Sequence, residues 1–144
     1  MSEQRSTSPS SGADEPRAAH KGTNLGPATA LVIERDEATR WTTRFMLERL
    51  GIRALMATDD GHAAEVVDGH PATFDLLLGG LVEDLHRIRS HLQRRQPRPA
   101  LLRLAASMPV DGDGMPVLCT PFGLNELREA VRAILHPGGR RPES

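Results

Sequence analysis

The chain has 144 residues, which is enough for one ordinary domain with a single buried core. Its 18 Lys and Arg residues nearly balance its 19 Asp and Glu residues, and the formal net charge of −1 gives no overall attraction to nucleic acid or to an anionic membrane. A lone cysteine, Cys119, excludes an intramolecular disulfide, and the lack of a long apolar run or an apolar leader predicts a cytoplasmic protein with no membrane contact.

The two ends of the chain differ in composition from its middle. Residues 1–27 are rich in Ser, Gly, Pro and Ala and contain no Val, Ile or Phe, so they cannot bury enough apolar surface to offset the entropy lost on ordering. Residues 137–144 are rich in Pro and Gly. We therefore expect a disordered N-terminal tail over 1–27, one domain over 28–136 and a flexible C-terminal tail over 137–144.

The first elements of the domain are predicted from apolar runs and helical spacing. Residues 30–33 form a short apolar run typical of a buried strand. Residues 37–50 repeat small and apolar side chains at helical spacing, and Gly51 is a good helix stop before a second strand over 52–57. The inward stripe of this helix consists of Thr39, Thr42, Thr43, Met46, Leu47 and Leu50.

The alternation of strand and helix continues to the end of the domain. Asp59 or Asp60 is expected to cap a short helix over the following residues. The later elements are a strand over 74–78, a helix over 81–95, strands over 100–104 and 115–119, and a helix over 124–135. Apolar strands that alternate with helices predict a parallel sheet covered on both faces, in a doubly wound α/β fold whose working site lies beyond the carboxyl ends of the strands.

Six short motifs follow one another through the domain. They are LVIERD (31–36), LERLGI (47–52), TDDGHAA (58–64), FDLLL (74–78), TPF (120–122) and LNEL (124–127). In this order and at about this spacing they resemble the motifs of receiver domains, the domains that accept a phosphoryl group in two-component response regulators. The resemblance covers roughly residues 29–136. It implies a flavodoxin-like sheet of five parallel strands in the order 2-1-3-4-5.

The resemblance also implies which positions would carry receiver chemistry, and here that chemistry is lost. Receivers bind Mg²⁺ through two acidic residues after the first strand. At these two positions this chain has Glu34 and Arg35, so one of the two acids is replaced by a base. The phospho-accepting aspartate after the third strand is replaced by Gly80, the Ser or Thr after the fourth by Ala105, and the lysine after the fifth by Thr120. Glycine has no nucleophile, and one carboxylate beside an arginine is a poor Mg²⁺ cage. We expect a degenerate pocket with no phospho-acceptor, no catalytic residue, no metal and no cofactor.

The spacing of the later motifs is short for a receiver domain. Gly80 and Ala105 are 25 positions apart, and Ala105 and Thr120 are 15 apart. The segment over 107–114 has little helical character. We therefore expect the fourth helix of the receiver fold to be short or absent.

Trp41 and Phe45 lie roughly opposite the inward stripe of the first helix. Exposed aromatic side chains are common anchors of protein interfaces, so they predict a surface that binds a partner. The alternative is a helix rotated so that these two side chains are buried, or covered by the N-terminal tail.

Together these features predict a pseudo-receiver, a non-catalytic protein–protein interaction module in bacterial signalling or regulation that works without phosphorylation. Its partner would be another signalling protein, a homodimer stays open, and direct nucleic-acid binding is not expected. One alternative is a sensor that binds a small molecule or nucleotide at Arg35, Gly80 and Thr120. Another is an atypical response regulator phosphorylated elsewhere, with Asp75 or Asp84 as a substitute aspartate.

Overall fold

The structure is a computed structural model that describes residues 27–109 and 114–136. The two predicted tails, apart from Pro27, lie outside the described residues. The elements are β2 (Thr29–Ile33), α2 (Glu37–Arg49), β3 (Arg53–Ala57), α3 (Asp60–Asp68), β4 (Leu76–Gly79), α4 (Val82–Leu92), β5 (Ala100–Ala105), β6 (Val117–Cys119) and α5 (Leu124–Leu135).

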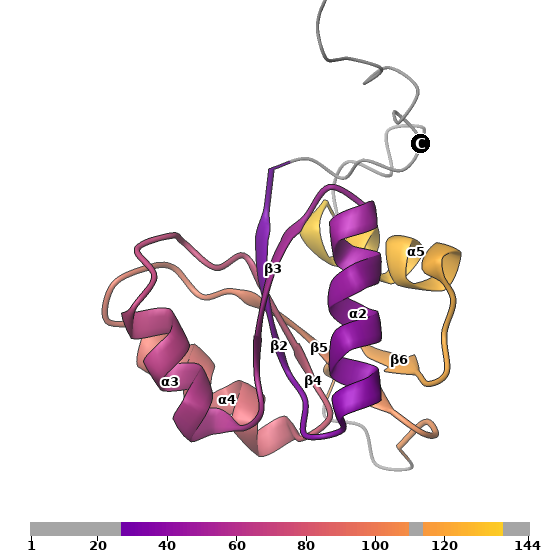
Figure 1. The fold of residues 1–144 in the computed structure, drawn as a ribbon, viewed down its shortest axis with the longest axis horizontal. Helices are drawn as coiled ribbons and strands as arrows, with labels where there is room; N and C mark the ends of the chain where they lie inside the picture. Colours follow the sequence, from indigo (N-terminus) through magenta and orange to yellow (C-terminus); the bar gives the residue numbers. More distant parts are fainter. Residues whose placement is uncertain (1–26, 110–113, 137–144) are drawn as a thin grey trace, which may run out of the picture.

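The strands of the described residues form one five-stranded parallel sheet in the order β3-β2-β4-β5-β6. Numbered along the chain, this is the order 2-1-3-4-5 of the CheY-like flavodoxin fold, so the predicted fold class is confirmed. Figure 1 shows three layers, with α3 and α4 on one side of the sheet and α2 and α5 on the other. Among the described residues, no helix is long and apolar enough to cross a membrane.

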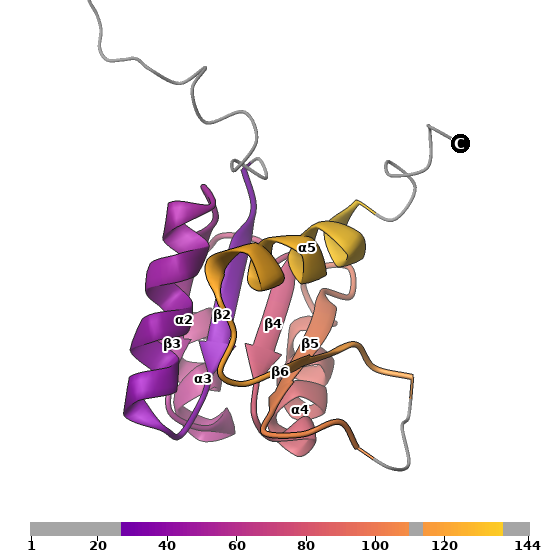
Figure 2. The same cartoon turned by 90° about the vertical axis from the view of Figure 1, so that its right-hand side faces the viewer.

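Each central strand is buried on both faces, which explains its continuous apolar run. In β2, Ala30 and Val32 pack against α2 and α5, whereas Leu31 and Ile33 pack against α3 and α4. All four side chains are at most 1% exposed. Helices cover both faces because every connection between parallel strands must cross back over the sheet. In Figure 2, β2, β4 and β5 run side by side behind α5, and the arrows of β2 and β4 point the same way.

Side-chain caps begin two of the helices where the sequence predicts them. Asp36 accepts a hydrogen bond from the backbone N–H of Thr39 at 2.8 Å and caps α2. Asp59 accepts one from the N–H of His62 at 2.9 Å and caps α3, so Asp60 is the first residue of the helix and not its cap. After α2 the chain turns through Gly51, whose φ of 87° favours glycine.

Three element bounds differ from the prediction by two residues or more. The helix predicted over 81–95 ends at Leu92, and the strand predicted over 115–119 begins at Val117. The strand predicted over 74–78 begins at Leu76, because the backbone of Phe74 is bound by a side chain: its N–H donates to Gln96 Oε1 at 2.9 Å, and its carbonyl accepts from Gln96 Nε2 at 2.8 Å. Apolar runs reveal the strands but not the polar contacts that end their pairing.

The connection from β5 to β6 contains no helix among its described residues, 106–109 and 114–116. This agrees with the predicted short or absent fourth helix. On that side of the sheet, next to α4, the half-exposed Met115 packs against the core.

Candidate functional site

Parallel strands bring the predicted pocket positions to one edge of the sheet. Glu34 follows β2 and Gly80 follows β4, and the preceding residues Ile33 and Gly79 are paired across the two strands. Ala105 ends β5, where its carbonyl accepts a hydrogen bond from the backbone N–H of Thr120 at 2.8 Å. All of these positions therefore lie at the carboxyl edge, as the sequence predicts.

Two consecutive glycines, Gly79 and Gly80, lie at the end of β4, and an added side chain would meet a different obstacle at each. A Cβ on Gly79 would lie well under 3.0 Å from the backbone carbonyl oxygen of Ile33, which the sheet holds in place. A Cβ on Gly80 would meet only a carboxylate, at 2.9 Å from Glu34 Oε1 and 3.3 Å from Oε2. Gly79 is required by the close approach of two strands, whereas at position 80 the Glu34 side chain occupies the space that a larger residue would need.

The environment of Glu34 sets its protonation. Partial burial raises the pKa of the Glu34 carboxyl, and the hydrogen bond that Oε2 accepts from the Asp36 N–H at 3.2 Å opposes this shift. The pKa of Asp36 is lowered because its carboxylate accepts hydrogen bonds from the hydroxyl and the N–H of Thr39. Asp36 is thus engaged as a helix cap. Within the described residues, no group of three or more His, Cys, Asp or Glu is arranged to hold a metal ion.

Arg35 forms an ion pair with the buried Asp84, which the sequence had suggested as a substitute phospho-acceptor. Its Nη2 lies 3.3 Å from Asp84 Oδ2 and 3.5 Å from Oδ1. The Asp84 side chain is 3% exposed and that of Arg35 is 56% exposed. Asp84 lies in the first turn of α4, where a negative charge is also favoured by the helix dipole. In the sequence, Asp84 is next to Leu85 and four residues before Ile88, and both of these side chains are buried. An acid on this apolar side of the helix was the signal that could have predicted the ion pair, because a buried acid requires a cation.

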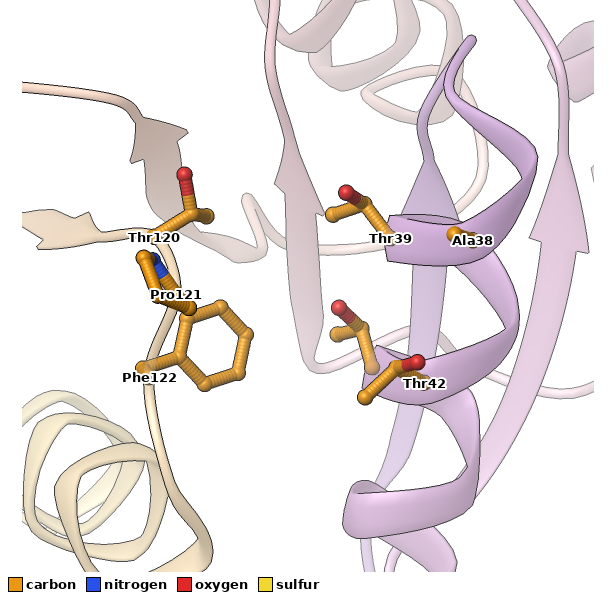
Figure 3. Close-up of a pocket in the computed structure, with 7 residues that line it drawn as sticks. Ala38, Thr39, Thr42, Thr120, Pro121 and Phe122 are labelled. Carbon is orange, nitrogen blue, oxygen red and sulfur yellow. The ribbon is translucent and has the colours of Figure 1, made fainter.

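The pocket residues are divided between two small hollows. One has a volume of about 170 Å³ and is lined by Ile33, Glu34, Arg35, Gly80, Leu81 and Asp84. The other, also about 170 Å³, lies between α2 and the segment after β6 and is lined by Ala38, Thr39, Thr42, Thr43, Thr120, Pro121 and Phe122. Figure 3 shows Thr120, Pro121 and Phe122 across from the α2 side chains. Arg35 and Gly80 therefore do not share a hollow with Thr120.

The two aspartates named as substitute phospho-acceptors have other contacts. Asp75 lies at the amino end of β4, where its Oδ2 accepts a hydrogen bond from the backbone N–H of Thr29 at 2.9 Å. That position is at the opposite edge of the sheet from Gly80. Asp84 is at the correct edge, but it is buried and paired with Arg35.

Trp41 and Phe45 are exposed on the outer face of α2. Their exposed fractions are 50% and 61%, and the guanidinium carbon of Arg44 lies 5.7 Å from the centre of the Trp41 ring. The guanidinium carbon of Arg49 lies 5.9 Å from the centre of the Phe45 ring. The alternative in which the helix is rotated to bury both aromatics is wrong. Thr42, predicted on the inward stripe, is exposed as well.

Comparison with known proteins identifies the class of fold. No family model matches the sequence, and no curated protein matches it. Solved structures do match. Chemotaxis protein CheY4 of Vibrio cholerae has a TM-score of 0.64 and 18% identity, covering 76% of this chain and 100% of that one. The receiver domain of the histidine kinase PA1611 of Pseudomonas aeruginosa, with magnesium in its active-site cleft, has a TM-score of 0.59 and 21% identity, covering 76% of this chain and 98% of that one.

A third match was solved as a complex with another protein. It is the receiver domain of the response regulator Ssk1 of Saccharomyces cerevisiae, bound to the histidine phosphotransfer protein Ypd1. Its TM-score is 0.62 and its identity 16%, covering 76% of this chain and 89% of that one. The chain therefore has the receiver fold, and the similarity at these identities concerns the fold.

Proposed function

We propose that the chain is a pseudo-receiver, a non-catalytic protein–protein interaction module that acts without phosphorylation in the cytoplasm of a bacterial signalling or regulatory system. The observation that carries this proposal is the contact at the carboxyl edge of β4. There Gly80 offers no nucleophile, and the carboxylate of Glu34 takes the space beside it.

The charges around this edge also argue against a phosphoryl group. A phosphoryl group is strongly negative and needs cations or N–H donors to hold it. Here it would meet the Glu34 carboxylate, while the one cation lining this hollow, Arg35, is paired with Asp84. The residue after β6 is Thr120, a hydroxyl without charge. The same pairing weakens the sensor hypothesis, because an anionic ligand at Arg35 would compete with a buried carboxylate.

The surface that supports an interaction role is the outer face of α2. Trp41 and Phe45 leave half or more of their area in water, which is costly unless a partner covers them. Large aromatic side chains dominate the binding energy of many interfaces. The complex of Ssk1 with Ypd1 indicates that a receiver fold serves as a docking unit for another signalling protein.

A capture experiment tests the proposed function. The wild-type chain, the variant Trp41→Ala/Phe45→Ala and a control variant, Glu65→Ala on the exposed side of α3, are immobilised and exposed to an extract, with and without acetyl phosphate and Mg²⁺. We expect one protein to be retained by the wild type and the control but not by the double variant, to the same extent with and without the phosphodonor. Equal retention by all three variants, or retention that depends on the phosphodonor, contradicts the proposal.

A further inference from the structure

The outer face of α2 presents one continuous stripe. Ala38, Trp41, Phe45 and Glu48 follow one another at spacings of three and four residues, and all four are exposed. Such spacing places side chains in a row along one side of a helix. We call the part of this row formed by Ala38, Trp41 and Phe45, together with the exposed Thr42, the aromatic face.

Opposite charges mark the two ends of this face. Glu37 is exposed in the first turn of α2, and Arg49 is exposed in its last turn. Between them, Glu48 is already engaged, with its Oε2 at 3.8 Å from Arg44 Nε and accepting a hydrogen bond from the backbone N–H of Ala54 at 3.3 Å. A partner that covers the aromatic face should therefore carry a basic group near Glu37 and an acidic group near Arg49.

We propose that the partner is a second copy of this chain, bound with the two α2 helices antiparallel about a two-fold axis between Trp41 and Phe45. The inference rests on the proposed function, since it names the partner of the surface proposed there. In this arrangement Trp41 lies against the partner's Phe45, and Glu37 lies against the partner's Arg49. A two-fold axis repeats each contact, so two aromatic pairs and two ion pairs form. A parallel arrangement would instead set Glu37 against Glu37 and Arg49 against Arg49.

A small hollow lies beside the aromatic face. The space between Thr42 on α2 and Phe122 after β6 has a volume of about 170 Å³ and is lined mainly by apolar atoms (Figure 3). In the antiparallel register the two aromatic rings pack on each other, so this hollow lies at the edge of the interface, beside Ala38 and Thr42, and holds neither ring.

The area of this surface sets the strength of the dimer. A Trp or Phe side chain buries about 150–250 Å² when it is fully covered, and here only the exposed half or so remains to be buried. One helix face is thus well below the roughly 1,200–2,000 Å² of a stable interface. The dimer should be weak and should depend on protein concentration.

The test uses the full chain in sedimentation velocity across micromolar to near-millimolar concentrations, together with fluorescence of Trp41, the only tryptophan in the sequence. We expect the mass to rise from 15.7 kDa toward twice that value. The fluorescence should shift to the blue and become harder to quench over the same range. Trp41→Ala/Phe45→Ala should raise the dissociation constant by more than about tenfold. Circular dichroism verifies that each variant is folded.

Charge reversal separates this arrangement from unspecific contact between aromatic surfaces. Glu37→Arg and Arg49→Glu should each weaken the dimer by about two- to tenfold, and the double variant Glu37→Arg/Arg49→Glu should restore it, because each new charge again faces its opposite. Glu65→Arg on α3 is the control that should change nothing. Weakening by both single variants without recovery in the double variant refutes the antiparallel register.

A single mass of 15.7 kDa at every concentration overturns the inference. If Trp41 is then shielded from quencher even in dilute solution, another part of the chain covers it; if it is freely quenched, the face is open to a different protein. Free quenching leaves the proposed function standing with another protein as the partner, whereas shielding in dilute solution removes the outer face of α2 as its docking surface. Covalent uptake of phosphate, by contrast, would defeat the proposed function whatever the mass in solution.

Discussion

Adding one methyl group at each of the two consecutive glycines after β4 should have very different effects on stability. Neither Gly79 nor Gly80 has a positive φ, so alanine suits both backbones, and a Gly to Ala change at a compatible site stabilises by about 0.4–1 kcal/mol. At position 79, however, the new Cβ would lie well under 3.0 Å from the Ile33 carbonyl oxygen and 3.2 Å from Leu85 Cδ2. Relief requires β2 and β4, two inner strands of the sheet, to separate at their carboxyl ends.

We expect Gly79→Ala to destabilise the fold by about 3 kcal/mol or more, at the upper end of the range for overpacked sites. At position 80 the obstacle is the Glu34 carboxylate at 2.9 Å, the end of a flexible side chain that can turn into water. Gly80→Ala should therefore remain within about 1 kcal/mol of the wild type. Urea unfolding followed by circular dichroism measures both. Equal losses, or a larger loss for Gly80→Ala, would refute the explanation of why each glycine is present.

Three further predictions concern the charges and the two faces of α2. Burial raises the pKa of the Glu34 carboxyl, so the folded state binds the carboxyl proton more tightly than the unfolded state. The contribution of Glu34 to the free energy of unfolding is therefore favourable at low pH and is lost as pH rises through the pKa of the folded state. Glu34→Gln should therefore gain stability relative to the wild type as pH rises above 4.5, and a flat difference between pH 4.5 and 7 would contradict this. Arg35→Ala leaves Asp84 buried without its cation and should lower the free energy of unfolding by about 1–2 kcal/mol. This is less than the cost at a fully buried pair, because Arg35 is half exposed. The double variant Arg35→Ala/Asp84→Leu should recover most of the loss when both are measured by urea unfolding. Leu47→Ala should cost about 2–5 kcal/mol while Trp41→Ala stays within about 0.5 kcal/mol, because Leu47 is fully buried and Trp41 is not; similar losses would mean that α2 is rotated.

The fold could be predicted from the sequence because its signals are local. The apolar run of 30–33, the helical spacing of 37–50 and the stop at Gly51 each depend on neighbours in the chain, and each corresponds to an element of the structure. The described residues between β5 and β6 contain no helix, and this too could be predicted, because the segment is short and contains Gly and Pro. The bounds were less accurate, since Gln96 ends the pairing before β4 from 22 positions away.

The site was predicted only as a set of positions. The sequence identifies Gly80 as the place of a missing aspartate, but not that Glu34 would occupy the space beside it. It places Arg35 in the pocket, but not that a buried carboxylate 49 positions away would bind it. Contacts of this kind depend on which strand ends become neighbours and on the side-chain rotamers adopted there. The spacing of residues along the chain predicts neither of these.

The central claim is that this receiver fold works without accepting phosphate, and intact mass spectrometry tests it most directly. The full chain is incubated with acetyl phosphate and Mg²⁺, beside a receiver domain that is known to be phosphorylated under the same conditions. Our account predicts that the control gains the mass of one phosphoryl group while this chain stays at its unmodified mass. A phosphorylated species of this chain, located by peptide mapping to Asp75, Asp84 or any other residue, would contradict it.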